Sequence, residues 1–144
     1  YRLRPELTEA AFASGMHRTS DRGRIDQHNR LVVVGRVDDV VQVGGINVSV
    51  AAVEGAVQEH PMVAEAAVVA VADDQWGSKI TAFVVANGLE SVSDQQLIAS
   101  IVERAANALG AESRPRDIVL MDSLPTLPTG KIDREQLRSL AAQS

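Results

Sequence analysis

The sequence predicts an α+β fold: a short mixed or antiparallel sheet flanked by about three helices and preceded by a β-hairpin. The first reason is the order of patterned segments from residue 40 onward, which is β, α, β, β, α, β, α. A second observation, the composition, limits the size of the fold, since 45% of the 144 residues are hydrophobic, enough for one domain core. The absence of cysteine excludes disulfides, thiolate nucleophiles, zinc ribbons and iron–sulfur clusters.

The hairpin is expected within residues 25–34, where two apolar flanks enclose polar turn residues. Just beyond it the charge balance changes sign. Residues 1–36 carry seven Arg and four acidic side chains (+3), whereas residues 37–144 carry seven basic and fifteen acidic side chains (−8). We therefore expect a boundary there, with an independently folding domain at residues 37–144. The start at Tyr1 fits a piece cut from a longer protein, although a complete protein freed of a tag would begin in the same way.

Turn and cap residues divide the first half of this domain. Residues 40–43 form a short strand that ends at a glycine pair, and Ser49 is the N-cap of a helix. Pro61 lies just past the end of that helix. Residues 66–71 and 80–86 are rich in β-branched or other apolar side chains and predict two buried strands. The apolar face of the helix contains Val50, Val53, Ala56 and Val57.

The second half holds the strongest helical pattern. Ser93 and Gln96 have the spacing of a capping box, and Gly110 suits the end of the helix that follows. A short strand at 118–121, a Pro-rich loop at 124–130 and a terminal helix come next. The apolar stripe of the capped helix consists of Leu97, Ile98, Ile101, Val102, Ala105 and Leu109.

Composition and spacing exclude several classes of function. The net charge of −5 argues against nucleic acid as the main partner. No apolar run approaches the roughly 18 residues of a membrane span, and no signal-peptide pattern opens the chain, so we expect a cytoplasmic location. The three histidines have no partner at metal-ligand spacing, and no metal site is predicted. Without a Gly-x-Ser-x-Gly elbow or a cysteine–histidine pair, a self-contained hydrolase is not expected.

Lys131 is the main candidate for chemistry. The segment Thr129-Gly130-Lys131 is not a phosphate-binding P-loop, because Pro125 and Ile132 stand where that loop needs Gly and Ser or Thr. Lysine is scarce, however, and Lys131 is one of only two. A lysine on a loop stiffened by proline and turned by glycine delivers a point charge to a phosphate or carboxylate. The alternative is a solvated lysine at the start of a helix.

Two further positions are candidates for binding. The pair Gly44-Gly45 permits positive φ angles or the close approach of a ligand to the backbone, although most such pairs are simply turns. Arg36, at the change of charge, suits hydroxyls or phosphates, and a surface salt bridge is its alternative role.

Three segments in this order resemble motifs of the AMP-forming acyl-CoA synthetases, the adenylate-forming superfamily. Residues 18–23 are similar to a segment with Thr-Gly-Asp, residues 35–48 to Gly-Arg-x-Asp followed by a glycine pair, and residues 124–134 to the Pro-rich Gly-Lys motif near the C-terminus. The Asp-x-x-Trp-Gly loop at 73–77 also looks like the family's. The departures are Ser20 in place of Gly, Gln42 in place of Lys and Leu127 in place of Thr. None removes a principal residue of the motifs.

The resemblance implies roles for particular residues. Asp21 and Arg36 would hold the ribose hydroxyls of the nucleotide, and Asp38 would be the hinge between two domains. Lys131 would bridge the carboxylate and the α-phosphate in the first half-reaction. Gly44 and Gly45 would line the coenzyme A tunnel in the second. On this interpretation, residues 1–36 are the C-terminal edge of a large nucleotide-binding domain, and residues 37–144 are a mobile lid.

The implied reaction consumes ATP, with Mg²⁺, and coenzyme A as substrates, without a bound prosthetic group. The implied partners are the chain's own N-terminal domain, a small carboxylic acid and, through that domain, a second copy in a homodimer. The style of the motifs looks most like o-succinylbenzoate–CoA ligases of menaquinone biosynthesis. Fatty acyl-CoA ligases and peptide-synthetase adenylation domains are close rivals, and a stand-alone, non-catalytic binding module is the alternative from another class.

Overall fold

The computed structural model describes residues 21–36, 39–87 and 92–143, together with residues 5, 9, 12, 16 and 19. The chain divides into two compact units, residues 1–38 and residues 39–144. The sequence placed a boundary after residue 36. That the first unit is the edge of a larger domain and the second a mobile lid stays a prediction.

The first unit contains the expected β-hairpin. Strands β1 (Asp21–Ile25) and β2 (Leu31–Arg36) pair antiparallel, with a bulge in β1. The carboxylate of Asp26 closes the turn, because Oδ1 accepts the backbone N–H of Arg30 at 2.9 Å and Oδ2 pairs with the Arg30 guanidinium at 2.8 Å. These bonds, that from the Arg30 backbone above all, hold the pKa of Asp26 below its usual value. Asn29 supplies the positive φ of 60° in the turn.

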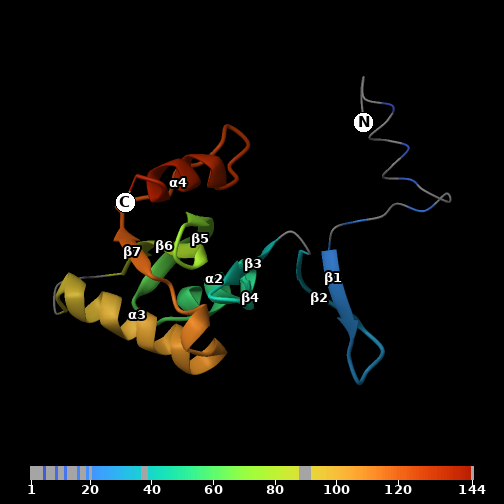
Figure 1. The fold of residues 1–144 in the computed structure, drawn as a ribbon, viewed down its shortest axis with the longest axis horizontal. Helices are drawn as coiled ribbons and strands as arrows, with labels where there is room; N and C mark the ends of the chain where they lie inside the picture. Colours follow the sequence, from blue (N-terminus) through green and yellow to red (C-terminus); the bar gives the residue numbers. More distant parts are fainter. Residues whose placement is uncertain are drawn as a thin grey trace. The chain divides into compact units, whose positions relative to one another are not determined.

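A three-stranded sheet forms the centre of the second unit (Figure 1). Strands β5 (Val63–Asp73) and β6 (Gly77–Ala86) form a long antiparallel hairpin. Helix α3 (Asp94–Leu109) then crosses over, so that β7 (Asp117–Leu120) pairs with β6 in parallel. The mixed sheet and its helices confirm the predicted α+β class.

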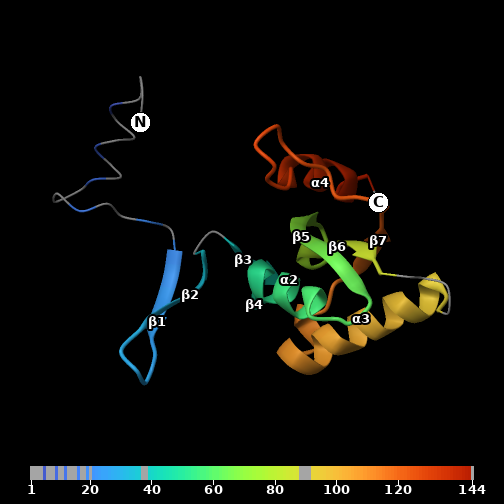
Figure 2. The ribbon, with the colours of Figure 1, turned by 180° about the vertical axis from the view of Figure 1, so that it is seen from behind.

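Both faces of this sheet are buried, and alternate residues of each strand point to opposite sides. One face packs against α3 and α2 (Val50–Gln58), and the other packs against α4 (Arg134–Ala141), as Figures 1 and 2 show. The side chains buried on the first face include Ala66, Val68, Ile80, Ala82, Val84, Leu97 and Ile101. Those on the second face are Ala67, Val69, Phe83, Leu124, Leu137 and Ala141.

The outer edge of β5 is closed by side chains instead of a fourth strand. The Gln58 side chain accepts the N–H of Ala66 at 2.8 Å and donates to the carbonyl of Ala64 at 3.1 Å. Glu54 accepts the N–H of Val68 at 2.8 Å. These bonds satisfy backbone groups that would otherwise be open to another strand.

Helix caps lie where the sequence predicted them, with one difference. Ser49 caps α2, and Ser93 and Gln96 complete the capping box of α3. The terminal helix, however, does not follow directly on the Pro-rich loop. It starts at Arg134, because the Asp133 carboxylate accepts the N–H groups of the first helical turn and acts as the N-cap.

A second, two-stranded sheet contains one strand that the sequence analysis missed. Strand β3 (Val40–Val43) was expected, but β4 (Ile46–Ser49) pairs with it directly after the turn Gly44-Gly45. Both glycines have positive φ, 58° and 85°, as a two-residue type I′ turn requires. Only one of the four side chains of β4 is buried, so the strand lacks the apolar pattern that marks longer strands.

Helices α2 and α3 are tied together at His60. Nδ1 accepts the N–H of Met62 at 3.2 Å, so the neutral ring carries its proton on Nε2 and donates it to Ser100 Oγ, 3.1 Å away. Burial lowers the pKa of His60, and the nearby charge of Arg104 lowers it further. The carboxylates of Glu59 and Glu103 line the same hollow.

We expect stability to fall as the pH drops below about 6.5, the ordinary pKa of an unfolded histidine. Because the pKa of His60 is lower in the folded protein, the unfolded chain takes up this proton at a higher pH than the folded protein does. Protonation therefore favours the unfolded state as the pH falls. Urea unfolding of the 144-residue chain between pH 7.5 and 5.5 measures the loss, with His60→Gln as the comparison. The carboxylates present in both proteins contribute equally to the pH dependence of their unfolding free energies, so the difference between the two curves reports His60. Parallel stability curves for the two would contradict the expectation.

The glycine turn gives a second prediction. An alanine Cβ at Gly44 would lie 3.0 Å from the Trp76 ring, whereas a Cβ at Gly45 meets nothing within 4 Å. Gly45→Ala is therefore expected to cost about 1–2 kcal/mol of unfolding free energy from backbone strain alone, and Gly44→Ala about 2–3 kcal/mol. Trp76 is the only tryptophan, so its fluorescence should shift in Gly44→Ala and not in Gly45→Ala. Equal effects of both changes would contradict the Trp76 contact.

Candidate functional site

Lys131 lies at the end of a tight hairpin in the Pro-rich loop. Thr126 and Ile132 form an antiparallel bridge, and the N–H of Leu127 donates to the carbonyl of Lys131 at 2.8 Å. The N–H of Gly130 donates to the carbonyl of Leu127, also at 2.8 Å. These bonds fix the backbone on both sides of the lysine.

Two residue types explain why the loop folds in this way. Pro128 follows Leu127 at the first corner of the turn, where its fixed φ is favourable. Gly130 has a φ of 79°, while nothing lies within 4 Å of a Cβ built on it. Its backbone conformation, and not lack of space, therefore demands glycine. The hairpin is of the kind in which an αL glycine follows a turn.

The Lys131 side chain is exposed. Among the residues that the structure describes, no carboxylate forms an ion pair with it. The other lysine differs, because Lys79 pairs with Asp117 at 2.8 Å. Lys131 is thus a cation without an ion-pair partner among the described residues, on a backbone fixed by hydrogen bonds. This arrangement suits contact with an anionic ligand.

Apolar contacts and one ion pair anchor this loop to the sheet. Leu124 is buried before it and Ile132 packs at its end, both on the face covered by α4. The N–H of Asp133 donates to the carbonyl of Pro125 at 2.8 Å. Arg134 then forms two bonds of 2.8 Å to the Glu54 carboxylate.

The glycine turn forms a separate part of the candidate site. The N–H of Gly44 donates to the carbonyl of Trp76 at 2.9 Å, and Asp73 accepts the N–H of Trp76 at 2.8 Å. The Arg116 guanidinium lies 3.7 Å from the centroid of the Trp76 ring. Three loops therefore meet beside Gly44-Gly45.

Sequence reasoning did not identify Arg116 as a contact of Trp76. The Asp-x-x-Trp-Gly resemblance was the one signal that pointed to this loop. The contact with Arg116 could not be predicted, because forty residues separate the two in the chain.

The remaining candidates lie in or next to the first unit. Asp21 and Arg36 are direct partners across the β1–β2 ladder, so their backbones lie side by side at the open end of the hairpin. Asp38 lies outside the described residues. Lys131 and the glycine turn, by contrast, stand on different loops of the second unit, one before α4 and the other between β3 and β4.

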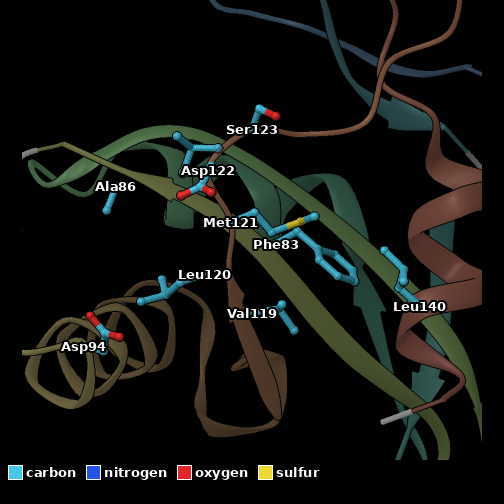
Figure 3. A pocket seen from close by; sticks show the side chains of 10 residues that line it. Phe83, Ala86, Asp94, Val119, Leu120, Met121, Asp122, Ser123 and Leu140 are labelled. Atoms are coloured by element: carbon cyan, nitrogen blue, oxygen red, sulfur yellow. The ribbon is translucent and has the colours of Figure 1, made fainter.

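An open hollow of about 870 Å³ runs along β6 and β7 of the second unit, and neither Lys131 nor the glycine turn lines it (Figure 3). Phe83, Val119, Met121 and Leu140 supply its apolar wall, and Asp94 and Asp122 lie at its rim. In the described part of the chain, no three metal-ligating side chains come close enough to hold a metal ion. No helix among the same residues has the length and apolar character needed to cross a membrane.

The sequence is similar to several CoA ligases over most of its length. It is 39% identical to acetyl-coenzyme A synthetase of Streptomyces avermitilis over 127 residues, which are 88% of this chain and 20% of that protein. It is 34% identical to 4-chlorobenzoate–CoA ligase of Arthrobacter sp over 140 residues, 96% of this chain and 26% of the relative. Long-chain-fatty-acid–CoA ligase FadD13 of Mycobacterium tuberculosis is 38% identical over 138 residues, with shares of 96% and 26%.

The fold is similar to parts of larger solved structures. The amide bond synthetase McbA from Marinactinospora thermotolerans superposes with a TM-score of 0.83 at 31% identity, covering 97% of this chain and 28% of that one. A Mycobacterium tuberculosis fatty acyl CoA synthetase gives a TM-score of 0.70 at 36% identity, with 99% and 28% covered. The chain thus spans between a fifth and just over a quarter of the length of these relatives.

A family model adds the residues that carry the likeness. The model described as AMP-binding enzyme C-terminal domain matches residues 52–131, a segment that begins in α2 and ends at the candidate lysine. The match covers more than half of the chain. The chain therefore belongs to the adenylate-forming acyl-CoA ligase superfamily, of which it contains the AMP-binding enzyme C-terminal domain.

Proposed function

We propose that this chain is the C-terminal part of an acid–thiol ligase. The enzyme joins a carboxylate to the AMP portion of ATP, taken as its magnesium complex, and releases pyrophosphate. Coenzyme A then displaces AMP to give the thioester. The observation that carries this proposal is the exposed Lys131, unpaired among the described residues, on a hairpin with fixed backbone hydrogen bonds.

Lys131 serves the first half-reaction. A carboxylate oxygen attacks the α-phosphorus, and the bond from that phosphorus to the bridging oxygen of pyrophosphate breaks. Negative charge accumulates on the phosphoryl oxygens where two anions meet. A positioned ammonium group lowers this barrier, because it holds the two reactants together and stabilises the charge that develops. The backbone hydrogen bonds around Gly130 already order the loop that carries Lys131, so the loop reorganises little during the reaction.

The second half-reaction needs an open path for the thiol. The sulfur attacks the acyl carbon, and the bond to the AMP oxygen breaks. The turn Gly44-Gly45 lines this path. Gly44 packs against Trp76, whereas the open space beside Gly45 lets a narrow pantetheine arm pass close to the backbone. Rotation of the lid about Asp38 removes Lys131 between the steps. Asp21 and Arg36, which face each other across the β1–β2 ladder, hold the ribose hydroxyls.

The substrate proposed is o-succinylbenzoate, which places the enzyme in menaquinone biosynthesis. The motif style at residues 18–21 and 44–49 supports it. The relatives named above act on acetate, a chlorobenzoate and long-chain fatty acids, and one forms an amide bond, so the family's acids vary widely. A fatty acid is an equally plausible alternative substrate.

The lysine is tested in the full-length enzyme. Lys131→Ala should lower acyl-adenylate formation, measured as pyrophosphate release, by about 100- to 1,000-fold, since it removes a transition-state charge partner. Thioester formation from supplied acyl-adenylate should change by no more than about threefold, because the lysine does not act in that step. Lys79→Ala, which removes a lysine paired with Asp117, is the matched control. Undiminished adenylation in Lys131→Ala would refute the role.

The acid is tested by assaying the same enzyme with ATP, coenzyme A and a panel of carboxylic acids. We expect kcat/KM for o-succinylbenzoate to exceed that for acetate, benzoates, fatty acids and amino acids by at least about tenfold, the discrimination that a few pocket contacts provide. A higher kcat/KM for a fatty acid would refute o-succinylbenzoate as the substrate and leave the proposed ligase activity intact. If the natural product of translation is no longer than this chain and turns over no acid, the binding-module alternative is correct.

A further inference from the structure

Arg134, three residues after the candidate lysine, makes the most elaborate side-chain contact among the described residues. Its Nη1 and Nη2 atoms donate to the two oxygens of Glu54, each at 2.8 Å. Nη1 also donates to the carbonyl of Val68 at 3.0 Å. Such paired bonds need the planar fork of an arginine, which a lysine does not provide.

The same contact joins three elements of the fold. Glu54 lies on α2, Val68 on β5 and Arg134 at the first position of α4. Glu54 Oε2 also accepts the N–H of Val68 at 2.8 Å, so the ion pair holds both backbone groups of this edge residue. Three hydrogen bonds of Arg134 thereby fix the first turn of α4 to α2 and to the sheet.

At the start of α4, Arg134 acts alongside the Asp133 cap and the packing of Ile132 on the sheet. The helix has eight residues, and only Leu137 and Ala141 are buried. Both lie beyond its first three positions, so apolar packing anchors the later part of the helix. Within the first turn, the side-chain hydrogen bonds to α2 and to the sheet come from Arg134.

The charges around Arg134 favour its cationic form. The hydrogen bonds that Arg134 donates to Glu54 raise the pKa of Arg134 above the ordinary arginine value, against the opposing effect of burial. The charges of Glu54 and Asp39 add to the same direction.

We infer that Arg134 and Glu54 are positioning residues that set the direction in which the lysine loop presents Lys131 to the reacting phosphate. This inference rests on the proposed adenylation role of Lys131. Neither residue needs to touch a substrate. Their effect arises because a tilt of the first turn of α4 displaces the lysine that precedes it, and a displacement of about 1 Å costs a reaction roughly 100-fold.

The test uses the full-length enzyme with Arg134→Lys, Arg134→Ala and Glu54→Gln. Arg138→Ala removes a neighbouring exposed arginine of the same helix and is the matched control. We measure kcat and KM for pyrophosphate release, the thioester step from supplied acyl-adenylate, and Tm. Arg134→Lys is expected to lower the adenylation kcat about 10- to 100-fold, while KM for ATP and the thioester rate change less than about threefold.

A double variant separates positioning from simple support of the fold. In a Lys131→Ala background, Arg134→Lys should cause no further loss of adenylation, because the group it positions is gone. A further loss of tenfold or more would overturn the inference. So would an equal fall in both half-reactions together with a lower Tm, which indicates general destabilisation. If Lys131→Ala alone is harmless, the proposed function of the lysine fails; if it is severe and Arg134→Lys is harmless, only the positioning role fails.

Discussion

The constraint on which the second unit depends is the burial of its central sheet on both faces. Alternate side chains of β5 and β6 point toward α2 and α3 on one side and toward α4 on the other. A small sheet with two covered faces needs helices from distant parts of the chain, and the last of these is α4. The lysine loop is the connection that leads into α4. Packing of Leu124, Ile132 and Leu137 on the second face therefore fixes where the loop begins and ends.

At the edge of the sheet, hydrogen bonds hold the backbone of β5, which apolar packing alone does not do. Side chains of α2 satisfy the open backbone groups of β5, Gln58 at one end and Glu54 toward the middle. Because Glu54 is already fixed by this bond, Arg134 meets a carboxylate of defined orientation. The ion pair is partly exposed, with 40% and 25% of the two side chains accessible, so solvent screens it and its contribution to stability is small. Its three hydrogen bonds nevertheless define the orientation of the first turn of α4 relative to α2 and β5.

Most helices and strands could be predicted from local signals in the sequence. Contacts between residues far apart in the chain could not be predicted. Ser49, Ser93 and Gly110 mark helix ends through bonds to neighbours in the chain, which a sequence reveals directly. Strand β4 was missed because four residues with one buried side chain carry no periodicity. The pairing of Arg134 with Glu54 spans eighty residues, and Trp76 with Arg116 spans forty. Of the candidate site, the motif residues could be named in advance, whereas their supporting contacts depend on the fold.

The two lysines of the chain differ in their charge partners. Lys79 lies within a strand and is neutralised by Asp117. Lys131 stands on an ordered turn with no such partner in the described structure. The φ of 79° at Gly130 and two backbone hydrogen bonds order the turn that carries Lys131. An ordered but unpaired cation has its charge available to an incoming anion, and order in the backbone keeps the entropic cost of that contact low.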